Sequence, residues 1–218
     1  MSDLARFLPL SNRDRGDESG TVGAWAHPAA ELLQAMAGVL DAHPALLTAA
    51  TLRPEVTVGA DVRDLLTRLG SPWYARWARV WGILPTPSAS VAALDDAALP
   101  SAVRERAQTL AAPSARVSIR DLGLVVAVAL DLQATHAAPL TVDPLSSGAV
   151  ALDLALRARH PQRSLVTART LVATDGDWRV GRGPELRSTG SAIVLFLAGR
   201  AGVPPEVQPD AEGSSALG

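Results

Sequence analysis

Apolar side chains in the first third of the chain recur with the period of an α-helix. Within residues 28–40 they stand at positions 32, 33, 36, 39 and 40, and His43-Pro44 marks the end of this predicted helix. A second helix is predicted over residues 60–69, with Val62 and three leucines on one face. Residues 70–72, which contain glycine and proline, interrupt it.

Three tryptophans follow at intervals of four residues. Trp73, Trp77 and Trp81 are therefore predicted to lie one above another on one face of a further helical segment. Such a stripe is more typical of a core or an interface than of a ligand site. Beside Arg76, however, it also suits the lining of a pocket for a planar or apolar ligand that carries an anionic group.

A proline-rich loop and a polar helix separate this stripe from the next apolar stretch, and they cover residues 84–100 and 101–110. Ser118 and Asp121 then have the spacing of a capping box. They predict the start of a buried helix that runs to about Leu132. A strand over residues 124–128 is the alternative, but the length of the apolar stretch and the cap favour the helix.

Strands are predicted only after His136, where the pattern changes. A helix is first expected over residues 145–159, ended by His160-Pro161. Its inward face is predicted to consist of four aliphatic residues, set against Arg157 and Arg159: Val150, Leu152, Leu154 and Leu156.

The stretch from residue 165 to residue 200 has the clearest pattern in the chain. A strand over residues 165–174 is expected to turn at Asp175-Gly176 into a second strand that carries Trp178 and Val180. A polar link that contains glycine and proline follows. Residues 193–198 then predict a helix without a polar face, which should be buried among other elements.

The elements predict an α+β protein of two parts. Residues 21–135 are expected to form a helical bundle and residues 136–207 a small α/β domain. Residues 1–20 are interpreted as a flexible arm and residues 208–218 as a flexible tail, because their composition is polar.

Composition makes some classes of partner and site unlikely but does not identify a function. The 218 residues are 48% hydrophobic with a formal net charge of -2, so no nucleic-acid or membrane partner is expected. The absence of cysteine excludes disulfides and thiolate metal ligands. No signal peptide or membrane span is recognisable, so a cytoplasmic protein, monomeric or homodimeric, is expected.

Residues 171–200 resemble the C-terminal domain of the maleylpyruvate isomerase family in the Asp-Gly hairpin, the Gly-Pro pair and the apolar helix that ends in Gly-Arg. Residues 57–70 and 122–133 resemble two helical segments of the same family. The resemblance implies a DinB-like four-helix bundle followed by a domain like that of sterol carrier proteins. It also implies a mycothiol-dependent activity with a bound zinc ion. Arg200 matches an arginine that points into the site between the domains; the alternative is a cation that caps the helix.

The ligand positions implied by the resemblance do not carry metal ligands. Arg68 stands at the first histidine, Leu124 at the glutamate and Val128 at the second histidine. None of the three can bind zinc, which takes neutral imidazole or anionic donors. Asp131 remains as a candidate general base, although an aspartate there is more often satisfied by its neighbours.

The sequence therefore predicts a metal-free relative that binds a small organic molecule, with or without metal-independent catalysis. One alternative is an active mycothiol-dependent isomerase or transferase with relocated ligands, which requires His27 or His43 to pack against His136. Another is a subunit that uses the tryptophan stripe as a protein interface. The glycine-rich residues 180–184 lack the spacing of a dinucleotide-binding loop.

Overall fold

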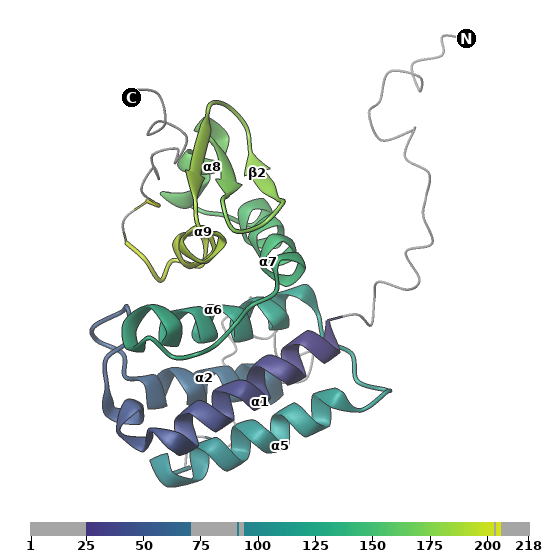
Figure 1. The fold of residues 1–218 in the computed structure, drawn as a ribbon, viewed down its shortest axis with the longest axis vertical. Helices are drawn as coiled ribbons and strands as arrows, with labels where there is room; N and C mark the ends of the chain where they lie inside the picture. Colours follow the sequence, from purple (N-terminus) through teal and green to yellow (C-terminus); the bar gives the residue numbers. More distant parts are fainter. Residues whose placement is uncertain (1–24, 71–90, 92–93, 203, 206–218) are drawn as a thin grey trace, which may run out of the picture.

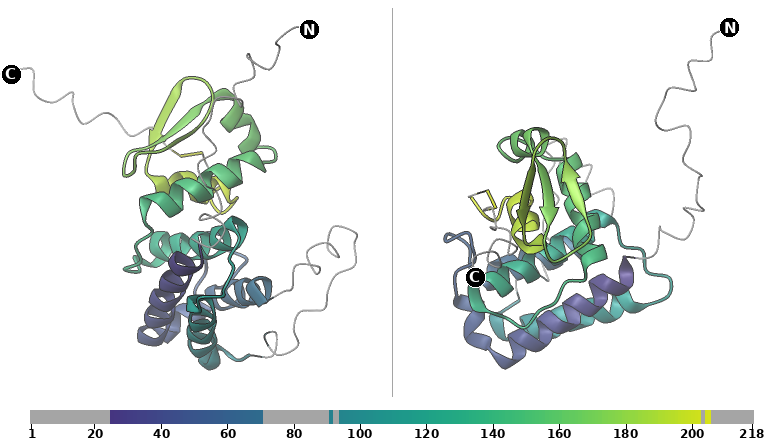
Figure 2. Two further views of the ribbon diagram at one scale, coloured as in Figure 1. Left: turned by 90° about the vertical axis from the view of Figure 1, so that its right-hand side faces the viewer. Right: turned by 45° about the horizontal axis from the view of Figure 1, so that its top comes forward.

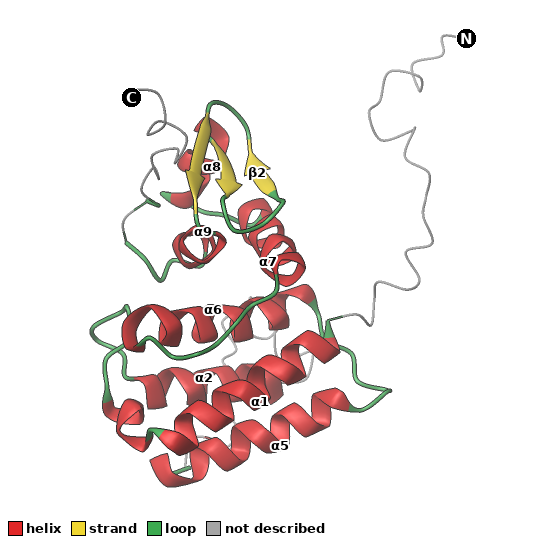
Figure 3. Cartoon of the chain, in the orientation of Figure 1, coloured by secondary structure: helices red, strands yellow, loops and turns green. Residues whose placement is uncertain are grey.

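The computed structural model describes residues 25–70, 91, 94–202 and 204–205 (Figure 1). Within these ranges the protein is α+β, with seven α-helices and a three-stranded sheet (Figure 3). The helical lobe consists of α1 (Ala26–Ala42), α2 (Val58–Gly70), α5 (Leu99–Ala111) and α6 (Ile119–His136), with the short 3₁₀ helices η3 (Pro44–Thr48) and η4 (Asp96–Ala98). The C-terminal lobe consists of α7 (Pro144–Leu156), α8 (Gln162–Ala168), β1 (Thr170–Ala173), β2 (Arg179–Gly181), β3 (Glu185–Ser188) and α9 (Gly190–Leu197).

Several sequence-based predictions lie outside the described residues. They are the tryptophan stripe with its arginine (Trp73, Arg76, Trp77 and Trp81), the arm over residues 1–20 and the tail over residues 208–218.

The four helices of the first lobe enclose one apolar core. α1 packs against α5 and α6, and α2 packs against the same two helices, so that the contacts close into a ring (Figure 1). Leu33, Met36 and Leu40 of α1 and Leu65 of α2 are buried in it. All four helices were predicted, α1 and α2 from the apolar period, α5 as a polar helix and α6 from its cap and the length of its apolar stretch, and the predictions are confirmed.

The start of α6 follows from the sequence. The Ser118 hydroxyl accepts a hydrogen bond from the Asp121 amide at 3.2 Å, and the Asp121 carboxylate accepts one from the Ser118 amide at 3.4 Å. The capping box is therefore present. The alternative of a strand over residues 124–128 is wrong, and the helix extends four residues past the predicted end.

In the C-terminal lobe, α7 and α9 lie side by side between the sheet and α6 (Figures 1 and 2). The strand order is β2-β1-β3, with β1 antiparallel to β2 and parallel to β3. The Trp178 side chain packs directly against glycines of both helices, Gly148 of α7 and Gly190 of α9. A Cβ at these positions would lie 2.9 Å and 3.0 Å from the tryptophan, so the close packing requires glycine. No helix in the described ranges is long and apolar enough to cross a membrane.

The predicted hairpin between the first two strands is present, but its limits differ from the prediction. Residues 165–168 belong to α8, so β1 is shorter than the predicted strand over residues 165–174. The turn is also wider than a two-residue Asp-Gly turn, because the Ala173 amide pairs with the Trp178 carbonyl at 3.1 Å. The Asp175 carboxylate instead accepts a hydrogen bond from the Gly190 amide at 2.6 Å, which ties the turn to the start of α9.

The third strand was not predicted, because the link after β2 contains glycine and proline. This link crosses the start of β1 in close contact with its backbone. Gly181 and Gly183 have φ angles of 105° and 115°. A Cβ at Gly181 would lie 2.2 Å from the Arg169 carbonyl oxygen, and one at Gly183 would lie 2.4 Å from that of Ala168. The two glycines are therefore required by the strand crossing.

The inward face predicted for α7 is partly wrong. Val150 is fully buried, whereas Leu152 and Leu156 are exposed to 52% and 79%. The predicted positions repeat every two residues, and a helix turns such positions to different sides. The apolar helix α9, by contrast, is buried as predicted.

Candidate functional site

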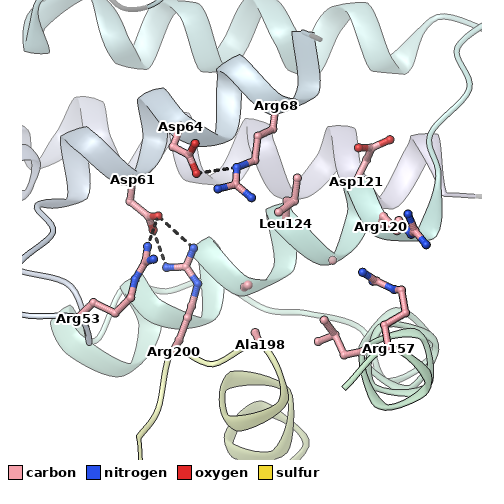
Figure 4. Close-up of a pocket in the computed structure, with 13 residues that line it drawn as sticks. Arg53, Asp61, Asp64, Arg68, Arg120, Asp121, Leu124, Arg157, Ala198 and Arg200 are labelled. Carbon is pink, nitrogen blue, oxygen red and sulfur yellow. Dashed lines mark hydrogen bonds and ion pairs between the residues drawn. The ribbon is translucent and has the colours of Figure 1, made fainter. Parts of the chain in front are cut away.

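A cavity of about 330 Å³ lies between the helical lobe and the C-terminal lobe, where α2 and α6 face α7 and the end of α9 (Figure 4). Its walls contain five arginines and three aspartates, and its apolar residues come mainly from α6. The lining residues are Arg53, Asp61, Asp64, Arg68, Arg120, Asp121, Gly123, Leu124, Ala127, Leu154, Arg157, Ala198 and Arg200.

Two buried aspartates lie at the inner end of the cavity, Asp61 in its lining and Asp131 behind its wall. Asp61 comes from the first turn of α2 and is 3% exposed, and Asp131 comes from α6 and is 1% exposed. Asp61 lies on the same face of α2 as Val58 and Leu65, so the fold carries its carboxylate into the interior. Buried carboxylates of this kind are stable only when cations or hydrogen-bond donors compensate them.

Arg200 joins both aspartates from the opposite lobe. Its Nη1 lies 2.5 Å from Asp61 Oδ2 and 2.9 Å from Asp131 Oδ2, and its Nη2 lies 3.1 Å from Asp61 Oδ1. Only 10% of the side chain is exposed. Burial lowers the pKa of Arg200, but the two aspartates more than offset it, so that the pKa is raised above its ordinary value and the guanidinium stays charged.

The end of α9 determines where Arg200 points. The Gly199 amide donates to the Phe196 carbonyl and the Arg200 amide to the Leu195 carbonyl, both at 2.9 Å, and Gly199 has a φ angle of 70°. This is a Schellman cap, which turns the chain sharply away from the helix axis. The sequence signal of Gly-Arg after an apolar helix therefore has a geometric consequence: it directs the guanidinium towards α2 and α6.

The loop that precedes α2 supplies the remaining partners of the two carboxylates. Arg53 Nη2 lies 2.8 Å from Asp61 Oδ1, and the Leu52 amide donates to Asp131 Oδ1 at 2.9 Å. Arg53 Nε is buried and has no hydrogen-bond partner among the described residues. Two arginines thus neutralise two aspartates, and the cluster connects three separate segments of the chain.

The outer part of the cavity is lined by arginines that are more accessible. Arg68 pairs with Asp64 at 2.7 Å on the surface of α2, and Arg157 pairs with Asp153 along α7. Arg120, in the first turn of α6, is exposed and makes no ion pair with any residue in the described ranges. Arg157, at the end of α7, lines the same cavity, and Figure 4 shows both arginines at the same end of it. Two neighbouring cations favour the binding of an anion.

Three of the residues predicted from the sequence meet in this cavity: Arg68, Leu124 and Arg200. Asp131 lies behind its wall as a partner of Arg200 and does not line it. Val128 is 3% exposed, belongs to the core of the helical lobe and is also absent from the lining. Val128 follows Leu124 by four residues and so lies one turn further along nearly the same side of α6, where its side chain is buried.

Sequence reasoning missed six charged residues that line the site: Arg53, Asp61, Asp64, Arg120, Asp121 and Arg157. One signal was available for Asp61, because its position relative to Val62, Leu65 and Leu69 puts it on the apolar side of the predicted helix. A carboxylate on such a face requires a partner. The three arginines had no comparable signal, because nothing in a single sequence distinguishes them from solvated surface cations.

The histidines do not assemble a metal site in the described part of the chain. His27 lies 3.1 Å from Glu31 on an exposed turn of α1, and His136 Nε2 lies 3.1 Å from the Ala50 carbonyl. No three side chains of the histidine, aspartate and glutamate types converge as metal ligands within the described ranges. The packing of His27 or His43 against His136, which relocated ligands would require, is not among the contacts observed there.

Comparison of the chain with known proteins does not identify a relative. No family model, no curated protein and no solved structure matches the chain.

Proposed function

We propose that the protein binds a small organic anion in the cavity between its two lobes, and that it is a divergent, metal-free member of the maleylpyruvate isomerase family. The order of the parts supports the family assignment, with four helices first and a small α+β unit second. The position of Arg200 at the end of the last helix supports it further, because this residue reaches the cavity.

The observation that carries the proposed binding function is the composition of the cavity wall. Its volume of about 330 Å³ lies at the lower end of the range for small-molecule sites. Arginines outnumber aspartates by two in the lining, and Leu124, Leu154 and Ala127 offer an apolar surface beside them. An anionic head group beside the arginines and an apolar body against α6 would use both features.

Arg120 is the best candidate for direct contact with the anion. Arg53 and Arg200 are already bonded to buried carboxylates, and Arg68 and Arg157 each have an aspartate within their own helix. Arg120 has no such partner among the described residues, so its donors remain available. A guanidinium can bind a carboxylate through two parallel hydrogen bonds.

We expect benzoate to bind the full chain more tightly than its uncharged analogue benzamide, as measured by saturation-transfer NMR. Arg120→Gln should weaken benzoate binding about tenfold, because it removes a hydrogen bond between charged groups. Leu124→Trp should abolish the binding of both compounds, because the larger ring fills the cavity. Raised salt should weaken binding of benzoate and leave benzamide unaffected.

Arg116→Gln is the matched control, since Arg116 is exposed just before α6 and does not line the cavity. Its affinity for benzoate should equal that of the unchanged protein. Equal affinity in the Arg120→Gln variant, or binding that survives Leu124→Trp, would show that the anion binds elsewhere.

The metal-free character has a separate test. Protein purified without chelator is expected to contain less than stoichiometric zinc by mass spectrometry, because Arg68 and Leu124 have no lone pair to donate where the resemblance implies ligands. Excess EDTA should leave the melting temperature unchanged, since a bound structural metal would contribute to stability. One zinc per chain, removed by EDTA with a fall in Tm, would refute this part of the proposal.

A further inference from the structure

The face of α7 that points away from the lobe interior carries a stripe of exposed apolar side chains. Leu145, Leu152 and Leu156 are 74%, 52% and 79% exposed, and Ala149 lies between them. Residues spaced by four, three and four positions fall on one side of a helix. Single exposed leucines are common, but a continuous row of them marks a surface that binds another apolar segment.

Ala149, Leu152 and Leu156 of this stripe form one wall of an apolar groove of about 510 Å³, on a different face of α7 from the charged cavity. Trp25, Val117 and Ile119 form the other wall, and they belong to the start of α1 and the residues around the start of α6. Nearly all of the groove is therefore apolar, with Ser118 and Asp153 at its edge.

The occupant follows from the way the chain enters the groove. Trp25 is the residue at which the described chain begins, so residues 1–24 are attached directly to the groove wall. Within them, Leu4, Phe7 and Leu8 have the spacing of one apolar helix face, and Leu10 adds a fourth apolar side chain.

The intervening chain is long enough for the segment to reach the groove. Residues 11–24 can span up to about 45 Å when extended, and α7 is about 20 Å long. These residues include Arg13, Asp14 and Asp17, whose charges favour solvent over an apolar surface. A tether of this length holds the apolar segment near the groove at an effective concentration in the millimolar range.

We propose that residues 4–10 dock in the groove between α7 and the Trp25 wall, within the same chain. This interaction covers the leucine stripe of α7 and makes the N-terminal segment part of the C-terminal lobe's surface. It is independent of the proposed anion binding, because the groove and the charged cavity share no lining residue. The two tests also use different variants.

The absence of cysteine makes a direct test possible. In the full chain, Ser11→Cys introduces a single thiol that can carry a nitroxide label. In uniformly ¹⁵N-labelled protein, we expect the amide signals of Ala149, Leu152 and Leu156 to lose most of their intensity through paramagnetic broadening. The amide of Gln108 on α5 should keep its intensity. The same label combined with Phe7→Ser and Leu8→Ser should restore most of the lost intensity of the α7 signals, because the undocked label lies near α7 only part of the time.

A mixed sample separates the proposed occupant from a second copy. Nitroxide-labelled protein without ¹⁵N is combined with ¹⁵N-labelled protein without nitroxide, and the proposal requires no broadening of α7. Broadening in this mixture would show that the segment docks on another molecule. The proposal would also be overturned if the doubly labelled protein showed no broadening, or if Phe7→Ser and Leu8→Ser left the broadening undiminished.

Discussion

Replacing Arg200 by alanine is expected to lower the free energy of unfolding by about 3–5 kcal/mol, because it leaves the buried Asp131 without a cation and removes one of the two cations of Asp61. Asp131 would keep only the Leu52 amide as a partner in the contacts described, and Asp61 would keep only Arg53. The two side chains are 3% and 2% exposed, so water cannot replace the guanidinium without opening the junction between the lobes.

Urea unfolding of the full chain, followed by circular dichroism, measures this loss. Arg200→Met keeps much of the aliphatic volume without the charge and should lose nearly as much as Arg200→Ala. Arg200→Lys keeps the charge but cannot reach both carboxylates with a planar fork, so its loss should be intermediate. Arg179→Ala, on an exposed position of β2, is the control and should change stability by less than about 0.5 kcal/mol. If Arg200→Ala and Arg179→Ala had equal effects, the ion cluster would not be what holds the carboxylates in the interior.

Gly181→Ala is expected to destabilise the protein by an amount on the order of 3 kcal/mol, from a strained φ angle and an overlap with backbone. The new Cβ would lie 2.2 Å from the Arg169 carbonyl oxygen and 2.9 Å from that of Val166, at a φ angle of 105°. Neither oxygen belongs to a side chain that can rotate away. The link from β2 to β3 must therefore shift, which weakens the pairing of both strands with β1.

Gly38→Ala provides the matched control with the opposite sign. Gly38 lies inside α1, and a Cβ there would meet no other atom within 4 Å. The same substitution should therefore stabilise the protein by about 0.5–1 kcal/mol, through the higher helix propensity of alanine. Thermal unfolding of the two variants beside the unchanged protein should show shifts of Tm in opposite directions. A Gly181→Ala variant as stable as the original would mean that the strand crossing relaxes freely.

The helices of this protein could be predicted because their signals are local. The apolar period located α1 and α2, and the Ser118–Asp121 pair with the long apolar stretch after it located α6. β3 could not be predicted in the same way. It follows β2 after a short link whose composition indicates a loop, and it forms a strand only because it pairs with β1. The error at residues 165–168 has a similar origin: a short apolar run fits a helix and a strand equally well, and tertiary packing decides between them.

The candidate site was predictable only where a residue belonged to a recognisable motif. Arg200 was found because the family resemblance matches the Gly-Arg after the apolar helix to an arginine that points into the site, and the cap at Gly199 does direct it inward. Leu124 and Arg68 were found through the family resemblance. Arg120 and Arg157 line one cavity because α6 packs against α7. This tertiary contact cannot be predicted from a single sequence.

The ion cluster also sets an order of events during synthesis. Arg200 follows Asp61 by 139 residues and Asp131 by 69 residues along the chain. During translation, all four helices of the first lobe therefore emerge from the ribosome before Arg200, the cation that pairs with Asp131, has been synthesised. Until then a buried carboxylate on α6 opposes the final packing of that lobe, even though its apolar core is complete. The last helix of the chain thus completes the folding of the first lobe as well as its own.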